Sequence, residues 1–178
     1  ARAPWRPIRD NFRTYEDVQR GLRSAGLESS NLIIGVDLTK SNEWTGKSSF
    51  QGRCLHAISR RPNSSNPYEA CLGICGRVLA PFDDDNLIPC YGFGCSQTSD
   101  HSVLDFSPEG SGGHLHGLDA VLQRYRRLIP HIRLAGPTSF GPLIRRAVDI
   151  VAETGGYHIL LIVADGNITR GSSQQEGT

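Results

Sequence analysis

The sequence predicts an α/β fold in which helices flank a doubly wound, mostly parallel sheet. Two apolar runs, residues 31–37 and residues 158–164, have the composition of strands that are buried on both faces of such a sheet. Between them, segments with the spacing of amphipathic helices alternate with shorter strand-like segments. There is no internal repeat, and 178 residues with 38% hydrophobic content can form one domain with a core of its own.

The N-terminal part begins with a basic segment, residues 1–10, which we expect to be extended. Thr14 and Asp17 have the spacing of a capping box, so a short helix is predicted to begin there. Gly26 is placed to end this helix, because glycine adopts the backbone conformation that commonly follows a last helical turn. The first apolar run then forms a strand.

After this strand, residues 42–52 are predicted to be a polar loop that leads into a helical piece at residues 53–58. The next helix has a clear start, with Asn66 as the N-cap, Pro67 at the first position and Glu69 at the third. Its predicted apolar face consists of Ala70, Ile74, Val78 and Phe82.

The second half of the chain continues the alternation. Residues 86–94 are predicted to form a strand, residues 101–106 an edge strand and residues 115–129 a helix. Thr138 or Ser139 is placed to cap the following helix. The apolar positions expected in that helix are Phe140, Leu143, Ile144, Ala147 and Val151.

Polar oxygen-bearing residues follow both apolar strands. The first strand ends in Asp37, Thr39 and Ser41, the last strand is followed by Asp165, and Thr138 lies between them in sequence. Strand ends of this kind meet at one edge of an open α/β sheet, and hard divalent cations prefer oxygen ligands. The residues therefore predict a metal site, although Asp, Ser and Thr are also common in plain polar turns and Thr138 could be a cap, a ligand or both.

Three longer motifs resemble those of a known family. They are residues 35–46 (GVDLTKSNEWTG), residues 79–94 (LAPFDDDNLIPCYGFG) and residues 134–140 (LAGPTSF). Asp-x-Thr-x-Ser, a later Thr after Gly-Pro and an Asp-Gly after a late strand resemble the metal-ion-dependent adhesion site (MIDAS) of von Willebrand factor type A (vWA) domains. The longer motifs resemble the copine-type branch, and within it the plant RING-domain ubiquitin ligases of the RGLG family.

The resemblance implies how the metal is held. The hydroxyls of Thr39, Ser41 and Thr138 contact it, while Asp37 and Asp165 bind it directly or through water. The implied cofactor is a divalent cation, Mg²⁺ in the first place, with Mn²⁺ and Ca²⁺ as alternatives. All five positions match the motif; one departure lies elsewhere, at Cys95, where relatives tend to carry an acidic residue.

The resemblance also implies the domain organisation. The vWA domain is expected at residues 11–171, between the basic segment 1–10 and a polar tail at residues 172–178, and it is expected to be incomplete at its C-terminal end. RGLG proteins add a RING domain, which needs paired Cys and His zinc ligands. This sequence has five cysteines and no Cys-x-x-Cys, so any ligase activity is expected to belong to a longer protein.

The implied function is metal-dependent protein binding that recruits substrates for ubiquitination, with an acidic residue of the partner completing the metal shell. The alternative is a copine-like, calcium-responsive membrane or signalling adaptor. No nucleophile with a supporting base is recognisable, so no catalytic site is expected in this chain.

Composition argues against other partners. The formal net charge is only +1, whereas nucleic-acid-binding domains are strongly basic, so the arginines are expected on solvated helix faces. No apolar run approaches the roughly 18 residues of a membrane span, so membrane association is expected only through parts not in this chain. An odd number of cysteines without a disulfide pattern favours an intracellular setting, in the cytoplasm or nucleus.

Two local motifs are expected to have no chemical role. Residues 46–48, Gly-Lys-Ser, resemble the end of a phosphate-binding loop, but Ser41 occupies the position where that motif requires glycine. His114 and His116 lie in a glycine-rich loop without further zinc ligands at defined spacing, so they are expected to be surface histidines.

Overall fold

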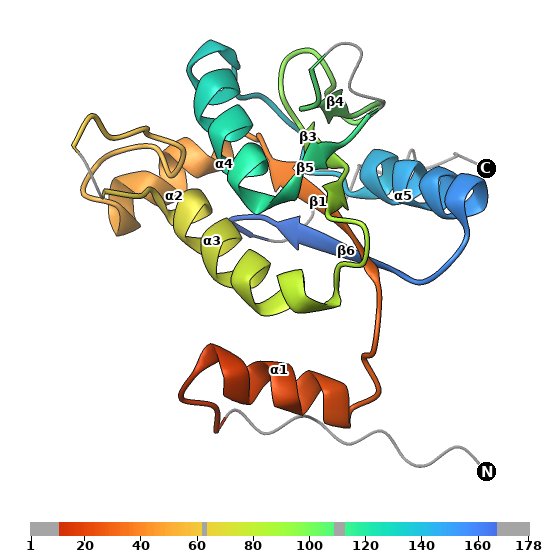
Figure 1. The fold of residues 1–178 in the computed structure, drawn as a ribbon. Coiled ribbons are helices and arrows are strands. Elements are labelled where there is room, and N and C mark those ends of the chain that lie inside the picture. The colour runs from red at the N-terminus through yellow and green to blue at the C-terminus, as the bar shows by residue number, and fades with distance from the viewer. Residues whose placement is uncertain (1–10, 62–63, 109–112, 167–178) are drawn as a thin grey trace, which may run out of the picture.

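A computed structural model of the chain describes residues 11–61, 64–108 and 113–166, and it confirms the predicted α/β fold (Figure 1). The central sheet has four strands: β1 (Asn31–Asp37), β3 (Cys90–Phe93), β4 (Leu104–Asp105) and β6 (His158–Val163). They lie in the order β4-β3-β1-β6. β1 is parallel to both of its neighbours, and β4 is antiparallel to β3 at one edge. The sheet is therefore mostly parallel.

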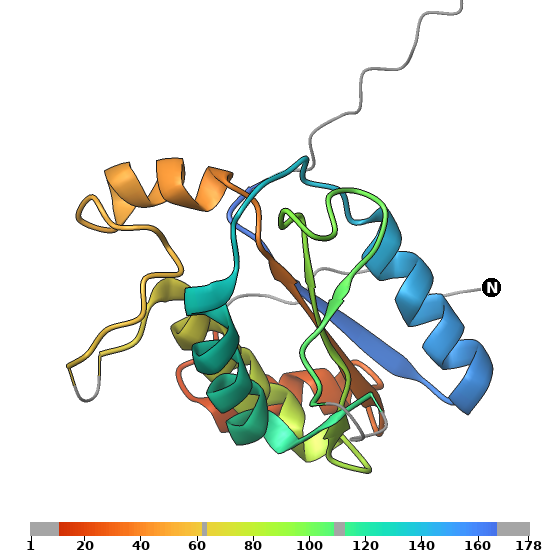
Figure 2. The same cartoon turned by 90° about the horizontal axis from the view of Figure 1, so that it is seen from above.

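Helices lie on both faces of this sheet (Figure 2). α3 (Pro67–Leu79) and α4 (Gly117–Leu128) cover one face, and α5 (Gly141–Thr154) covers the other. α1 (Tyr15–Ser24) packs against α3, and α2 (Ser41–Ser49) follows directly after β1. The smaller elements are the 3₁₀ turns η1 (Ala80–Phe82) and η2 (Ile129–His131) and an antiparallel pair formed by β2 (Leu87–Ile88) and β5 (Leu115–His116).

The side chains of β1 divide the core into two layers. Ile34 and Val36 belong to the buried cluster that also contains Leu72 of α3 and Val121 of α4. Ile33 points to the opposite face, where its cluster contains Leu143, Ala147 and Ile150 of α5. This alternation explains the continuous apolar run of β1, because a strand in the middle of a parallel sheet is covered on both faces.

Both predicted capping boxes are confirmed. In α1, the Asp17 backbone N–H donates to the Thr14 hydroxyl at 3.1 Å, and the Asp17 carboxylate accepts from the Thr14 backbone. In α3, the Glu69 backbone N–H donates to Asn66 Oδ1 at 2.9 Å, and Glu69 Oε2 accepts from the Asn66 backbone at 2.8 Å. Pro67 occupies the first helical position, where no N–H is needed.

The apolar face predicted for α3 is only partly right: Ala70 and Ile74 are exposed and Val78 is half-buried, whereas Phe82, which follows the helix in η1, is buried as expected. Ile74 is 50% exposed. Leu72, two residues earlier and on the opposite side of the helix, is fully buried. The buried face consists of Tyr68, Leu72 and Gly76, at successive helical turns. A tyrosine and a glycine contribute little to a hydrophobic pattern, so the sequence favoured the face that carries Ile74.

Two expectations between β1 and α3 are also wrong. The polar stretch predicted to be a loop forms α2, and residues 53–58 are not helical. α2 buries only Asn42 and Gly46, so it has no apolar stripe that would mark it as a helix. A Cβ atom at position 46 would lie 2.0 Å from the Arg53 carbonyl oxygen, so the glycine allows the following loop to pack directly on the helix.

Several strand and helix boundaries differ from the prediction. The expected strand at residues 86–94 is divided at Pro89 into β2 and β3, since proline cannot donate to a strand ladder. The edge strand expected at residues 101–106 is reduced to β4, and the helix expected at residues 115–129 becomes helical only at Gly117. β6 lies at the sheet edge and is mostly half-buried rather than covered on both faces.

The helix expected after residue 138 begins later than predicted. Its N-cap is Phe140, so neither Thr138 nor Ser139 caps it. Ile144 and Val151 were expected in its apolar face, but they are 47% and 37% exposed. Both line an open apolar pocket together with Ile33 of β1 and Leu160 of β6, so they lie beside the sheet without being fully covered.

Among the described segments, no helix combines the length and the apolar character needed to cross a bilayer. The basic segment predicted at residues 1–10 and the polar tail predicted at residues 172–178 lie outside the described residues, as does the domain end predicted at residue 171.

Candidate metal centre

The five side chains predicted to hold a metal lie together at the carboxyl edge of the sheet. Asp37 is the last residue of β1, Thr39 follows it, and Ser41 is the first residue of α2. Asp165 comes two residues after β6. Because β1 and β6 are parallel neighbours, their carboxyl ends meet at one edge, as the sequence predicted.

Thr138 reaches this edge through a segment that runs beside the loop after β1. The Lys40 backbone N–H donates to the Ala135 carbonyl at 2.7 Å. Gly94, at the end of β3, has a φ of +79°, and a Cβ atom there would lie 2.3 Å from the Thr39 methyl carbon. Glycine at this position therefore lets Thr39 and the Thr138 segment pack together.

The hydroxyls of the cluster form a directed chain of hydrogen bonds. An ionised Asp165 can only accept, so the Ser41 hydroxyl donates to Asp165 Oδ1 at 2.9 Å. Ser41 Oγ then accepts from Thr39 Oγ1 at 2.7 Å. Thr138 Oγ1 donates in turn to Thr39 Oγ1 at 3.4 Å, a long contact. Four of the five predicted side chains are thus joined by their oxygens.

Asp37 is the fifth member and is fully buried. Its Oδ1 accepts from the Thr39 backbone N–H at 2.8 Å, which fixes the carboxylate to the start of the loop. Its Oδ2 is buried and has no hydrogen-bond partner among the described residues. Burial raises the pKa of Asp37, since the charged form loses solvation, and the charge of Asp165 nearby raises it further.

The donor set fits a hard divalent cation. It consists of two carboxylates and three hydroxyls, all oxygen ligands, which suit Mg²⁺, Mn²⁺ and Ca²⁺. A cation would also satisfy the unpaired Oδ2 and offset the cost of burying the Asp37 charge. The hydroxyls are essential to this fit, because within the described ranges no group of three or more His, Cys, Asp or Glu side chains is arranged to hold a metal.

Thr45 belongs to the site and was not predicted. Its hydroxyl donates to Asp165 Oδ2 at 2.7 Å, so both carboxylate oxygens of Asp165 accept from α2. Thr45 lies four residues after Ser41, one helical turn along the same face. The spacing could have revealed it, but only if the stretch had been recognised as a helix.

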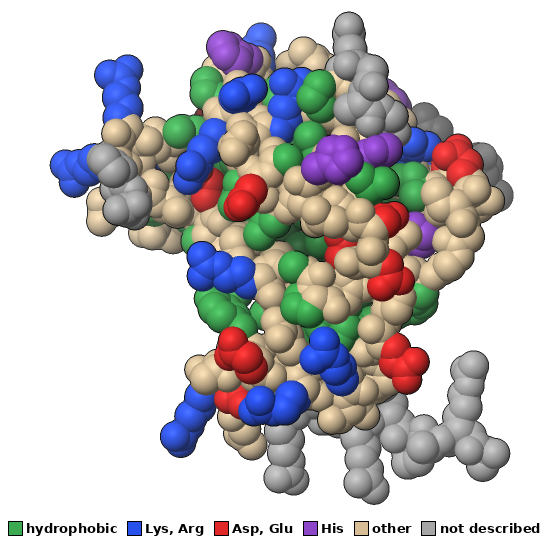
Figure 3. Space-filling model, viewed as in Figure 1, with side chains coloured by type: hydrophobic (Ala, Val, Ile, Leu, Met, Phe, Trp, Pro, Cys, Tyr) green, Lys and Arg blue, Asp and Glu red, His purple; other side chains and the backbone are tan. Residues whose placement is uncertain are grey.

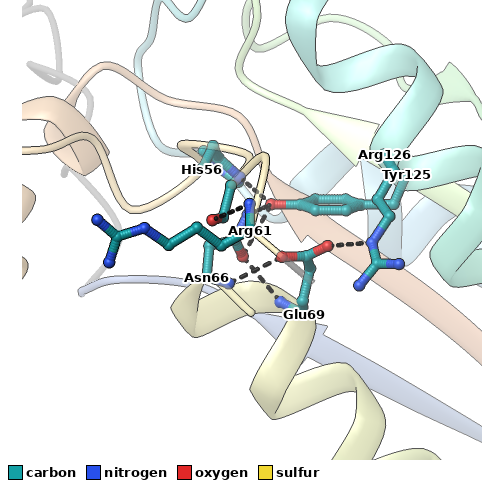
Figure 4. A network of polar contacts seen from close by, with 7 residues as sticks. His56, Arg61, Asn66, Glu69, Tyr125 and Arg126 are labelled. Atoms are coloured by element: carbon teal, nitrogen blue, oxygen red, sulfur yellow. Dashed lines mark hydrogen bonds and ion pairs between the residues drawn. The ribbon is translucent and has the colours of Figure 1, made fainter. Parts of the chain in front are cut away.

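A buried network of polar side chains, shown in Figure 4, reaches the backbone of Asp37 through His56. His56 Nε2 lies 2.8 Å from the Asp37 carbonyl oxygen, which can only accept, so this nitrogen carries the proton. Nδ1 is therefore bare and accepts from the Tyr125 hydroxyl at 2.7 Å. Tyr125 in turn accepts from Asn66 Nδ2 at 3.3 Å. Burial lowers the pKa of His56 to about 4, which keeps the ring neutral.

The network extends through the start of α3 to the surface of α4. Asn66 and Glu69 form the capping box, and Glu69 also pairs with Arg126 (Figure 4). The Glu69 side chain is 2% exposed, while that of Arg126 is 53% exposed. Asn42 of α2 also holds the loop after β1 in place, because its Nδ2 donates to the Thr39 carbonyl oxygen at 3.0 Å.

Among the described residues of the cluster, no hydroxyl is paired with a histidine that could act as its general base. Both ring nitrogens of His56 are occupied within the protein, so His56 cannot act as a general base toward a ligand. His116, in β5, is exposed and His114 is half-buried, with ring centroids 5.9 Å apart. Cys95, the position that departs from the family motif, is buried in the core.

Charged side chains are interspersed on the face shown in Figure 3, where acidic groups lie among the basic ones. Several arginines have defined intramolecular partners. Arg124 donates to the Phe106 carbonyl at 2.6 Å, and Arg146 donates to the Tyr91 hydroxyl at 3.1 Å. These side chains contribute to the packing of α4 and α5.

Several known proteins resemble this chain in sequence. The profile of the copine family matches residues 54–178. The chain is 56% identical to E3 ubiquitin-protein ligase RGLG4 of Arabidopsis thaliana over 171 residues, and 51% identical to RGLG5 of the same plant. It is 45% identical over 156 residues to Copine family protein 1 of Caenorhabditis elegans.

These matches cover most of this chain and a smaller share of each relative. The alignments span 96% of the chain for both ligases and 88% for the nematode protein. They span 41%, 38% and 14% of the respective relatives. The chain thus spans about two fifths of the length of RGLG4.

Proposed function

Because this chain belongs to the copine family, we propose that it is a metal-dependent protein-binding domain that recruits substrates for ubiquitination. Five plant relatives at 50–56% identity are all named E3 ubiquitin-protein ligases, which supports a role in recruiting substrates for ubiquitination. The proposal that protein binding depends on a metal rests on the candidate metal centre.

One observation carries the metal proposal: the buried Oδ2 of Asp37 has no hydrogen-bond partner among the described residues, beside a row of hydroxyl oxygens. An unpaired buried carboxylate oxygen is costly unless something compensates it. A divalent cation is the compensation that suits an all-oxygen cluster. Asp37 and Asp165 would hold it together with Thr39, Ser41 and Thr138.

The burial of the cluster indicates where a partner approaches. Asp37, Thr39 and Thr138 are buried, whereas Ser41 and Asp165 are only half-buried. A bound cation would supply positive charge and a coordination position for a carboxylate of the partner. We therefore assign the partner an acidic residue that approaches from the side of Ser41 and Asp165.

The activity of the whole protein is a separate proposal, since the ligase relatives are more than twice as long as the part they share with this chain. We assign ubiquitin transfer, and any contact with a membrane, to parts of such a protein outside this segment. The proposed setting is intracellular, as the five free cysteines favour.

A copine-like, calcium-responsive adaptor is the second candidate. It is favoured by the 45% identity to Copine family protein 1 over 88% of the chain. The two candidates differ in their cation: an adaptor of this kind should bind Ca²⁺ at concentrations where Mg²⁺ has no effect, and a Mg²⁺-dependent recruiting domain should not.

Selection from a displayed random-peptide library tests the proposal. The immobilised chain is panned in Mg²⁺, and bound peptides are eluted with acid, which releases them whether or not their binding depends on the metal. We expect the enriched peptides to contain Asp or Glu and to be lost with Thr138→Ala. The matched control is Ser139→Ala, which removes a neighbouring hydroxyl that makes no contact in the cluster, and it should keep the peptides. Equal recovery of the same peptides in chelator would contradict metal-dependent binding.

A further inference from the structure

A pocket of about 290 Å³ lies beside the candidate metal centre. Lys40 lines it, and Lys40 stands between Thr39 and Ser41 of the cluster. Residues 132–134 line another side, and the next residue, Ala135, is held to the Lys40 backbone by the 2.7 Å hydrogen bond described above. The pocket therefore adjoins the loop that carries Thr39 and Ser41.

The buried residues of the mixed lining offer few free hydrogen-bonding groups. His56 lines it and is 3% exposed, but its two nitrogens are bonded to Asp37 and Tyr125. Burial raises the pKa of the Cys54 thiol, so this neighbour is uncharged. Ile129, 8% exposed, is the other buried residue of the lining. A polar group entering the pocket would find no free partner in His56.

Part of the lining is apolar. Ala57, Ile132 and Leu134 are half-buried and line the pocket. Its volume of about 290 Å³ is at the lower limit of small-molecule sites, which are roughly 300–1,000 Å³. A single aliphatic or aromatic side chain matches such a space, because it can bury its surface there without needing hydrogen bonds.

Three charged residues complete the lining. Lys40 and Arg133 are exposed, and both favour acidic groups at the mouth of the pocket. Glu43 is half-buried and also lines it, so an acidic side chain is disfavoured inside. The charges thus separate two positions: an acidic residue outside the pocket, toward Lys40, and an uncharged side chain within it.

We propose that this pocket receives an apolar side chain of the bound protein, close in sequence to the acidic residue that the metal centre takes. The inference rests on the proposed function and specifies the partner more narrowly: an extended segment that combines an acidic residue with a Leu-, Ile- or Phe-like neighbour. Lys40 and Arg133 then favour acidic residues around this pair.

A short segment suits two sites that share one loop. Lys40 lies one residue from both Thr39 and Ser41, and consecutive Cα atoms are about 3.8 Å apart. An extended peptide advances about 3.3 Å per residue, and neighbouring side chains point to opposite sides. We therefore expect the apolar residue one to three positions from the acidic one, always on the same side of it.

Peptides enriched by the panning experiment test the pocket directly. For one such peptide, fluorescence polarisation in Mg²⁺ gives the Kd before and after its apolar residue is changed to Ser. We expect binding to weaken about tenfold, the effect of losing the burial of one apolar side chain. Ala57→Trp, which fills the pocket, should weaken the parent peptide similarly and leave the Ser peptide unchanged.

Val148→Trp is the matched control, since it adds the same side chain at a 61% exposed position of α5 and should alter neither peptide. Leu134→Ala is a second pocket variant in case the larger residue disturbs folding; it should also reduce the difference between the two peptides. Equal Kd values for both peptides on the wild-type chain would overturn the pocket proposal.

The same titrations separate this inference from the proposed function. If the chelator abolishes binding and the Ser change has no effect, the metal site stands and the pocket proposal is wrong. If the Ser change and Ala57→Trp weaken binding as expected but the chelator does not, the pocket proposal stands and the metal-dependent function is contradicted.

Discussion

His56 and Asp37 are joined by a hydrogen bond of 2.8 Å from the imidazole Nε2 to the backbone carbonyl oxygen. The contact lies on the core side of β1's last residue, where the chain leaves the sheet to form the metal-site loop. Since the Tyr125 hydroxyl donates to the other ring nitrogen, the orientation of the ring is fixed from both sides. The position of Asp37 thus depends on His56 and Tyr125, neither of which is a proposed metal ligand.

Tyr125→Phe should weaken metal binding without changing any ligand. Removing the hydroxyl leaves His56 Nδ1 buried without a donor, which costs roughly 1–3 kcal/mol of unfolding free energy. The freed ring then holds the Asp37 carbonyl less firmly, and we expect the Kd for Mn²⁺ to rise about tenfold, as for other residues that orient metal ligands. Calorimetric titration with Mn²⁺ measures it.

Tyr91→Phe is the control for this experiment. Tyr91 is also buried, and its hydroxyl accepts from Arg146 at 3.1 Å on the opposite face of the sheet. It should lower stability while leaving the Kd for Mn²⁺ unchanged. An equal rise of the Kd in both variants would show that Tyr125 acts through general stability and that the His56 contact has no specific effect.

Thr45 should matter through its hydroxyl alone. Thr45→Val keeps the shape of the side chain but removes the donor to Asp165 Oδ2, so Asp165 is less well fixed and Mn²⁺ affinity should fall several-fold. Thr45→Ser restores a hydroxyl and should restore most of the affinity. The same calorimetric titration checks both, and a Val variant that binds as tightly as wild type would remove Thr45 from the site.

The two capping boxes should differ in their contribution to stability. Asn66→Ala removes a buried cap that also donates to Tyr125, so we expect a loss of about 2 kcal/mol, at the upper end for caps. Thr14→Ala removes an exposed cap with no such second contact, and about 0.5–1 kcal/mol is expected. Urea unfolding of both variants gives the comparison; equal losses would mean that the Tyr125 contact adds nothing.

Two substitutions in α3 test which face packs on the sheet. Leu72 is fully buried, so Leu72→Ala should cost about 2–5 kcal/mol through lost burial and the cavity left behind. Ile74 is half-exposed, and Ile74→Ala should cost roughly 1 kcal/mol or less. Urea unfolding would contradict the observed packing if the Ile74 variant were the less stable of the two.

The sequence predicts the fold where local chemistry and burial agree. The apolar run of β1 and the capping boxes at Thr14 and Asn66 are read correctly because each depends on neighbours in the chain. α2 is missed because it packs through Asn42 and Gly46 and carries no apolar stripe. Tertiary contacts, rather than hydrophobic periodicity, decide that helix and also the orientation of α3.

The site is predictable to a similar degree. Asp37 and Asp165 could be placed together because parallel strands bring their carboxyl ends to one edge. The contributions of Thr45 and His56 could not be foreseen, since one depends on the missed helix and the other on a loop residue that meets Tyr125 of a distant helix. The His56 contact is set by packing and leaves no pattern in the sequence, whereas the spacing of Ser41 and Thr45 becomes informative once α2 is recognised as a helix.

Thermal unfolding of wild type and Asp37→Asn, with and without Mg²⁺, tests the central proposal that the cluster binds a cation. Without metal, the variant should melt at or above the wild type, because it removes a buried charge whose Oδ2 has no partner among the described residues. At about one hundred times the Kd, bound metal adds roughly 2.7 kcal/mol, and the wild-type Tm should rise by about 5–10 °C.

The variant should show no such rise, while Asp149→Asn, an exposed carboxylate on α5, should respond as the wild type does. A Tm that rises equally in wild type and Asp37→Asn, or in neither, would contradict the account.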